Sequence, residues 1–238
     1  MGKGPTRHMK RELSPSFWPI PRKEKVFAVK TAPGPHPLRE SLPILVIVRD
    51  ILGYAGTEKE AKTLIKQGRI LVDRSTRREE DFPVGAMDVV EIPDSKQVFR
   101  ALPDKKGGLK LHPIRGSETS FKLCRIMGKT TLKGGRTQLN LHDGRNVALS
   151  EGGDKYEVYD VLQLRIPESE VTDHIRFDRG VQAVVTGGRS RGGHGTLTEL
   201  GSEPGIKRTA TIRTSEGEEI RTLAKYVFAV GSKEPLIS

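Results

Sequence analysis

Seven lysine and arginine side chains fall within residues 57–80, and the chemistry that such a group supports is neutralisation of a polyanion. The segment TEKEAKTLIKQGRILVDRSTRREE contains Lys59, Lys62, Lys66, Arg69, Arg74, Arg77 and Arg78. Basic side chains release the condensed counterions of a nucleic-acid backbone, and this release drives binding. The alternative is a solvated helix face that has no partner. We expect these seven residues to contact phosphates.

The first half of this segment has the pattern of an amphipathic helix. Thr57 followed by Glu60 is the signature of a capping box, and Gly68 suits a helix end. Between them, an apolar stripe recurs at i, i+3 and i+4, at Ala61, Leu64 and Ile65. At about 100° per residue, the lysines lie on a side rotated away from this stripe. The acidic residues sit in the first turn, where the helix dipole favours them, which argues against a merely solvated face.

The rest of the segment predicts a short strand and a turn. The apolar run ILV at 70–72 is typical of a buried strand. Asp73, Arg74 and Ser75 are residues that favour a turn. We expect the turn to bring further arginines to the same end of this unit.

Residues 1–30 predict a basic arm. Eight lysines and arginines against two glutamates give this segment a net charge of +6, and Pro15, Pro19 and Pro21 disfavour a helix. Such an arm is expected to stay disordered until it binds a polyanion. Trp18 either anchors the arm to a neighbouring surface or packs on the body of this chain. The candidate nucleic-acid contacts in the arm are Lys3, Arg7, Lys10 and Arg11.

A second basic feature is the glycine-rich loop from Gly187 to Gly195. Its glycines let the backbone approach a partner closely, and Arg189 and Arg191 supply positive charge. The alternative is a flexible hairpin end. We expect both arginines to contact a nucleic acid.

Three motifs suggest chemistry but lack the residues that it needs. MGKTT at 127–131 ends like a phosphate loop, but Leu123 stands where that motif needs its first glycine. Asp173 and His174 have no evident nucleophile, and neighbours on a strand point to opposite faces. The six histidines have no metal-ligand spacing, and Cys124 is the only cysteine. We expect no catalytic residue, no metal site, no cofactor and no small-molecule substrate.

Composition bounds the class of protein. The 238 residues include 41 lysines and arginines against 30 acidic residues, a net charge of +11, which favours an anionic partner. Aromatic residues are only 5%, so phosphate and shape contacts are expected instead of base stacking. There is no secretory signal, and the longest apolar run, LPILVIV, is too short to span a membrane. We expect a soluble intracellular protein.

The order of patterns predicts an α+β, multidomain chain. Residues 1–40 form the arm and residues 41–103 form a small helix–helix–strand unit, whose first helix is capped by Ser41 and ends at Gly53. From residue 97 onward the pattern is β, with HDGRN as a hairpin turn. We expect a central β domain at 104–172 and a small closed barrel at 173–238.

The motifs, in this order, resemble one ribosomal protein family, the archaeal and eukaryotic small-subunit family S-four-e. The family's N-terminus is similar to GPTRHMKRELSPSFWPI and GPHPLRESLP, and the core of the S-four RNA-binding domain is similar to TEKEAKTLIKQGRILVD. Later parts of the family are similar to FPVGAMDVVEI, FKLCRI and VTDHIRFDRG. The KOW motif of an SH3-like barrel resembles VQAVVTGGRSRGGHGTLTEL. The end at VGSKEPLIS, without a basic tail, resembles archaeal members, whereas Arg189-Ser190-Arg191 departs from the usual KOW loop.

This resemblance implies a structural protein of the small ribosomal subunit, cytoplasmic and ribosome-bound. Its partners would be small-subunit ribosomal RNA and neighbouring ribosomal proteins, and no membrane. An RNA-modifying enzyme, such as a pseudouridine synthase, is the main alternative because it uses the same RNA-binding domain. A KOW-type elongation factor and an anionic-membrane binder are further alternatives. The first would leave the arm unexplained, and the second would need an amphipathic helix with a large apolar face.

Overall fold

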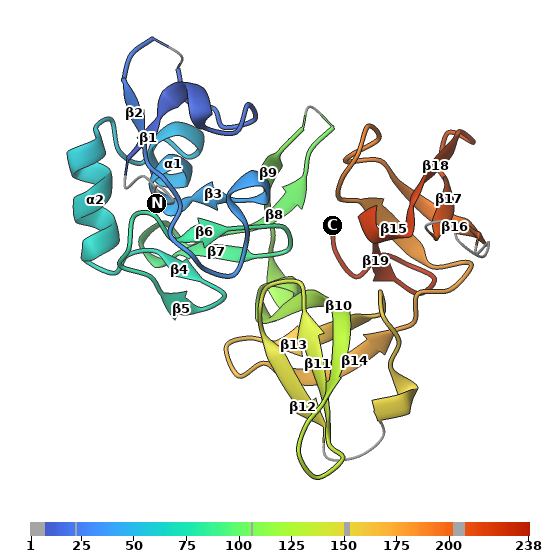
Figure 1. Ribbon diagram of the computed structural model, residues 1–238. Coiled ribbons are helices and arrows are strands. Elements are labelled where there is room, and N and C mark those ends of the chain that lie inside the picture. Colours follow the sequence, from blue (N-terminus) through green and yellow to red (C-terminus); the bar gives the residue numbers. More distant parts are fainter. Residues whose placement is uncertain (1–7, 22, 106, 150–152, 202–207) are drawn as a thin grey trace, which may run out of the picture.

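The computed structural model describes residues 8–21, 23–105, 107–149, 153–201 and 208–238. Within them the chain has a mixed fold with few helices and many strands, and each strand pair is antiparallel. Figure 1 shows three groups of elements: an N-terminal part that contains both α-helices, a central sheet and a C-terminal sheet. Short segments of 3-10 helix lie at Arg11–Leu13, Leu38–Glu40, Pro93–Ser95, Gly116–Ser120, Gly153–Lys155 and Ala224–Tyr226.

The N-terminal part packs its helices against a five-stranded sheet of order β5-β4-β7-β8-β9. The helices are α1 (Ile44–Val46), which continues as a π-helical segment at Ile47–Ile51, and α2 (Glu58–Lys66). The sheet strands are β4 (Leu71–Val72), β5 (Ser75–Thr76), β7 (Val89–Ile92), β8 (Gln97–Pro103) and β9 (Leu109–Pro113). Two small pairs complete this part: β1 (Met9–Lys10) with β2 (Phe27–Ala28), and β3 (Leu42–Pro43) with β6 (Pro83–Val84). The sheet therefore extends beyond the expected boundary at residue 103.

The first helix forms where the sequence predicts it, but its start differs. Residues 44–48 are fully buried, and the helix stops before Gly53, whose φ is +67°. The expected cap by Ser41 is wrong, because its hydroxyl donates to the carbonyl oxygen of Pro37 at 2.9 Å and the helix begins after Pro43. The first N–H groups of the helix donate instead to main-chain oxygens, that of Ile44 to Phe82 at 3.1 Å and that of Leu45 to Glu80 at 3.0 Å.

The described part of the arm is packed on the protein, contrary to the expectation of disorder. The side chain of Trp18 is 2% exposed and lies in one apolar cluster with Met9, Ile20 and residues of α1 and α2. Its indole N–H donates to the carbonyl oxygen of Ser41 at 2.9 Å. A buried tryptophan removes a large apolar area from water while its polar atom stays paired. The prediction failed because average composition hides a few large apolar residues.

The central sheet has the order β12-β11-β10-β13-β14. Its strands are β10 (Phe121–Thr131), β11 (Thr137–Leu141), β12 (Asn146–Leu149), β13 (Val161–Arg165) and β14 (Glu170–Ile175). A register shift between Ile126 and Gly128 divides β10, which pairs with β13 before the shift and mainly with β11 after it. The hairpin predicted at HDGRN is confirmed, since Gly144 between β11 and β12 has φ +77°. Strand β14 spans the expected boundary at residue 172.

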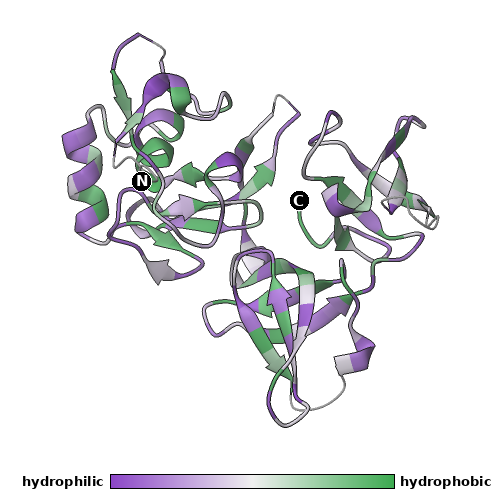
Figure 2. Cartoon of the chain, viewed as in Figure 1, coloured by the Kyte–Doolittle hydropathy of each residue, from purple (hydrophilic) through white to green (hydrophobic). Residues whose placement is uncertain are grey.

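The C-terminal sheet has the order β18-β17-β16-β15-β19. Its strands are β15 (Gln182–Val185), β16 (His194–Gly201), β17 (Thr209–Arg213), β18 (Glu219–Leu223) and β19 (Val227–Gly231). Its buried residues, such as Val185, Leu197 and Phe228, share an apolar cluster with Leu123 of β10. Figure 2 shows hydrophobic residues along the strands of the sheets and in α1, whereas α2 is largely hydrophilic.

Candidate nucleic-acid interface

Helix α2 has the start and the orientation that the sequence predicts. The backbone N–H of Glu60 donates to the Thr57 hydroxyl at 3.3 Å, and the N–H of Thr57 donates to the Glu60 carboxylate at 3.3 Å. Ala61 and Ile65 are buried against the core, and Leu64 is half-buried. The opposite side of the helix faces solvent, so its lysines are available on the surface.

The three lysines of α2 differ in whether they form ion pairs. Lys59 and Lys66 are exposed, and neither forms an ion pair within the part of the chain that is described. Lys62 lies between two carboxylates, 3.0 Å from Glu58 and 3.0 Å from Glu80. Hydrogen bonds to these carboxylates raise the pKa of Lys62, and the bond with Lys62 lowers the pKa of Glu58. A phosphate that binds Lys62 must therefore compete with two carboxylates.

Three arginines extend this basic surface beyond the helix. Arg74 is exposed in the β4–β5 turn, at φ +59°. Arg78 lies beside the end of α2: a Cβ built on Gly68 would be 3.6 Å from the Nε of Arg78. Arg69 makes an ion pair with Asp94 at 3.2 Å, but both side chains are more than half exposed, so the pair is weak. We call Lys59, Lys62, Lys66, Arg69, Arg74 and Arg78 the α2 basic surface.

Arg77 does not belong to this surface. It is half-buried, with its guanidinium 4.5 Å from the centre of the Phe82 ring. Its Nε is buried and has no hydrogen-bond partner among the described residues. Arg77 lines a cavity of about 370 Å³ whose charged lining also includes Asp73, Asp88, Lys122, Asp143 and Arg145.

The sequence gives no sign of the charged cluster behind this cavity. The ammonium group of Lys122 on β10 lies 2.8 Å from Asp73, 2.5 Å from Asp88 and 3.0 Å from Asp143. Arg145 reaches Asp73 at 2.6 Å and Asp143 at 3.3 Å. We call these five residues the junction network, because Asp73 and Asp88 belong to the N-terminal part and the others belong to the central sheet. The network fixes one part against the other.

Electrostatics keeps Lys122, Asp88 and Asp143 of the junction network ionised. Burial alone would lower the pKa of Lys122, but the carboxylates of Asp88 and Asp73 outweigh it and raise that pKa well above its ordinary value. Burial would raise the pKa of Asp143, yet the Lys122 ammonium holds it at about 2. The pKa of Asp88 is also lowered, against its burial, by Lys122 and by His36, whose Nε2 is 3.0 Å away.

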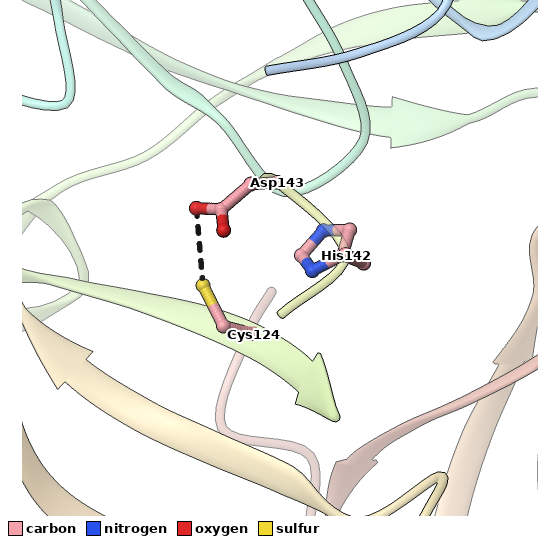
Figure 3. A group of neighbouring side chains, drawn as sticks. All are labelled: Cys124, His142 and Asp143. Carbon is pink, nitrogen blue, oxygen red and sulfur yellow. Dashed lines mark hydrogen bonds between the residues drawn. The ribbon is translucent and has the colours of Figure 1, made fainter. Parts of the chain in front are cut away.

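Cys124 and His142 lie beside Asp143 of the junction network, and these three residues have the composition of a metal site. Their candidate ligand atoms all lie within 4.8 Å of one another (Figure 3). These atoms already have partners. The Cys124 thiol donates to Asp143 at 3.4 Å, and burial raises its pKa well above the ordinary value, so it stays protonated. His142 accepts the N–H of Arg125 at Nδ1 (3.2 Å), and its Nε2 lies 3.2 Å from the Ala86 carbonyl oxygen, to which it must donate. With Lys122 also on Asp143, the group fits a hydrogen-bonded packing role better than a cation site.

The glycine-rich loop packs more closely than a free hairpin end. Its Gly192 has φ +78°, and a Cβ there would lie 2.5 Å from the backbone nitrogen of Lys105. Arg189 is exposed, whereas Arg191 is half-buried with its guanidinium 5.9 Å from the Phe17 ring centre. The two arginines therefore have different surroundings.

The basic residues of the arm also differ in their exposure and in their contacts. Lys10 is exposed on β1. Arg11 donates from Nε to the Ile20 carbonyl oxygen at 3.0 Å and from Nη1 to the Ser14 hydroxyl at 2.7 Å, which closes the loop around Trp18. Lys3 and Arg7 lie outside the described residues.

The motifs that suggest other chemistry are explained by structure. Residues 127–131 of MGKTT belong to strand β10, so no helix follows the glycine to bind a phosphate. His174 pairs with Asp160 at 2.8 Å and stacks edge-on to the Tyr156 ring. No helix in the described ranges is long and apolar enough to cross a membrane.

Comparison with known proteins identifies the family. Successive segments match the RS4NT (NUC023) domain at residues 3–39, the S4 domain at 43–90 and the ribosomal family S4e at 95–171. A protein named small ribosomal subunit protein eS4 from Methanothermobacter thermautotrophicus is 48% identical over 98% of this chain and 95% of its own length. The protein of the same name from Methanocaldococcus jannaschii is 45% identical over 99% of this chain and 98% of its own length.

A solved structure agrees with this. The crystal structure of the 30S ribosomal protein S4e from Thermoplasma acidophilum matches with a TM-score of 0.69 and 30% identity, over 81% of this chain and 96% of that chain. The similarity of sequence extends over nearly the full chain, and the structural similarity over most of it. The chain therefore belongs to the ribosomal S4e family, as the order of its motifs predicted.

Proposed function

We propose that this protein is a structural constituent of the small ribosomal subunit that binds and stabilises small-subunit ribosomal RNA. The observation that carries the proposal is the α2 basic surface, which is exposed on a helix whose other side is fixed in the core. Relatives that match over nearly the full chain carry the name of a small-subunit protein. The mechanism is release of counterions and neutralisation of charge where RNA strands crowd together.

The predicted contacts fall into three groups under this proposal. Lys59, Lys66, Arg74, Arg78, Lys10 and Arg189 are exposed and can meet phosphates directly. Lys62 and Arg69 must first exchange a carboxylate for a phosphate. Arg11, Arg77 and Arg191 are half-buried: Arg11 closes the loop around Trp18, and Arg77 and Arg191 lie against the rings of Phe82 and Phe17. Lys3 and Arg7 remain predicted contacts of the arm.

We also propose the finer points of the assignment. The C-terminal sheet would be an SH3-like barrel with a KOW motif in the β15–β16 loop, next to a distinct central β domain. Its neighbours would be other small-subunit proteins in the cytoplasm, and it would have no small-molecule substrate. An RNA-modifying activity is not favoured, since Asp173, His174 and Cys124 all have structural partners. Incubation with RNA followed by nucleoside analysis would reveal such an activity.

RNA binding by the α2 basic surface is tested with two triple variants of equal charge. Lys59→Ala, Lys66→Ala and Arg78→Ala remove three exposed cations from this surface. Lys96→Ala, Arg165→Ala and Arg213→Ala remove three exposed cations elsewhere, two of which already pair with glutamates. The first variant should reduce the slope of log K against log salt by about 2–3 for a small-subunit ribosomal RNA transcript, since each contact contributes about 0.7–0.9. Equal slopes for the two variants would overturn the assignment.

A further inference from the structure

A cavity of about 340 Å³ lies where the three parts of the chain meet. The N-terminal part contributes His36, Glu40 and Ala86, and the central sheet contributes Arg125, Met127 and His142. The C-terminal sheet and its loops contribute the remaining lining: Thr186, Gly187, Arg191, Lys225, Tyr226 and Phe228. This volume is at the lower end of the range of about 300–1,000 Å³ for ligand sites. We call it the junction cavity.

The charge of the junction cavity is positive. Its lining carries Arg125, Arg191 and Lys225 against a single carboxylate, that of Glu40. None of the three cations forms an ion pair within 4.0 Å among the described residues. His142 adds no charge, because burial lowers its pKa to about 3, and His36 is turned to Asp88 at 3.0 Å.

Arg125 is a buried cation that lacks an anion. It is only 8% exposed, and its Nη1 donates to the carbonyl oxygens of Lys225 at 2.8 Å and Val227 at 3.0 Å. Its Nη2 lies 3.6 Å from the sulfur of Met127, and its Nε has no partner in the described structure. The Nε of Arg191 on the facing loop is also buried without a partner. Arg125 and Arg191 therefore line the same cavity, and neither pairs with a carboxylate of the described residues.

Guanidinium donors match the oxygens of a phosphate. Arg presents its N–H groups as a planar fork that fits phosphate, and a lysine beside it adds a point charge. We propose that the junction cavity binds a phosphate of the RNA backbone, so that one strand connects the central sheet to the C-terminal sheet. The choice of RNA as the source of the phosphate rests on the proposed function.

The first test uses inorganic phosphate and the full chain, without RNA. Arg125 holds two carbonyl oxygens, so the variant is Arg191→Gln with Lys225→Gln, which leaves those bonds intact. The control, Arg221→Gln with Lys233→Gln, removes the same charge from exposed sites outside the cavity. Each tenfold rise in phosphate above its Kd should raise the unfolding midpoint of the native chain and the control by roughly 3–5 °C over chloride at equal ionic strength. The cavity variant should lose this rise, and an undiminished rise in it, or none in the native chain, would overturn the site.

The second test separates the source of the phosphate. With small-subunit ribosomal RNA, the cavity variant should lose about 0.7–0.9 of salt slope for each contact removed, beyond any loss in the control. If the phosphate response is lost but RNA binding equals that of the control, the cavity is a site for free phosphate and the RNA assignment is wrong. If the native chain does not bind this RNA at all, the proposed function fails, whereas the result with inorganic phosphate still decides the site.

Discussion

The ammonium group of Lys122 lies 2.8 Å from the carboxylate of Asp73, which joins the central sheet to the turn after β4. Asp73 also accepts the backbone N–H of Val89 at 3.1 Å, so its side chain links three segments. The next residue, Arg74, is exposed on the α2 basic surface. The junction network therefore fixes the position of the β4–β5 turn, which is predicted to contact RNA, through buried contacts of Asp73.

Removal of Lys122 should destabilise the protein severely. Lys122→Met leaves three buried carboxylates with fewer partners, and loss of one member of a buried ion pair costs about 3–5 kcal/mol. The free energy of unfolding in urea measures this. The matched control is Lys110→Met on β9, an exposed lysine, which should change the free energy by less than about 0.5 kcal/mol. A loss for Lys122→Met as small as that of the control would show that the network is not formed.

Stability should fall as the solution becomes acidic, and His142 should contribute the first part of the loss. Burial lowers its pKa from 6.5 to about 3, with the Lys122 ammonium as the second cause. The unfolded chain therefore takes up the proton first, so this contribution is present above pH 6.5 and is lost as pH falls towards 3. Asp143, with its pKa lowered to about 2, extends the loss below its ordinary value of 3.8.

The comparison of two histidine variants isolates this effect. His142→Gln should show a flatter dependence of unfolding free energy on pH between 6.5 and 3 than the native chain. His112→Gln, at a partly exposed position on β9, should keep the native slope in the same range. Identical slopes for His142→Gln and the native chain would mean that His142 titrates normally.

Trp18 should contribute to the stability of the folded body. Trp18→Ala should lower the free energy of unfolding by about 3–5 kcal/mol, since it removes a fully buried aromatic side chain from the core of α1 and α2. Leu13→Ala, at a side chain that is 70% exposed in the same arm, should change it by less than about 0.5 kcal/mol. Deletion of residues 1–30 should therefore destabilise the protein. An unchanged unfolding midpoint after this deletion would show that the arm does not pack on the folded body.

A carboxylate that competes for Lys62 should weaken RNA binding. Glu80→Gln removes the charge that lies 3.0 Å from the Lys62 ammonium, so it should increase affinity for small-subunit ribosomal RNA. Glu79→Gln changes the charge equally at an exposed neighbour that does not pair with Lys62. Filter binding at one salt concentration should give a gain of at least about twofold for Glu80→Gln over Glu79→Gln, consistent with about 0.5 kcal/mol for an exposed pair. Equal affinities would exclude Lys62 from the interface.

Local patterns in the sequence predicted local structure well. The capping box of Thr57 and Glu60 and the buried stripe of α2 depend on residues within one or two turns, so they could be inferred from spacing alone. The junction network could not, because Lys122 meets partners 49 and 34 positions away along the chain. The basic residues Arg11 and Arg77 were predicted as surface contacts from charge alone. Their side-chain directions are set by Ile20 and Phe82, which spacing does not reveal.

Sedimentation of cell lysate through a density gradient, with this protein detected across the fractions at low and high salt, tests the central claim most directly. The proposed function predicts a peak with the small ribosomal subunit, at one copy per subunit, that persists at high salt. A peak of free protein, or one that modest salt displaces from the subunit, would contradict a structural role and favour a transient factor or an RNA-modifying enzyme.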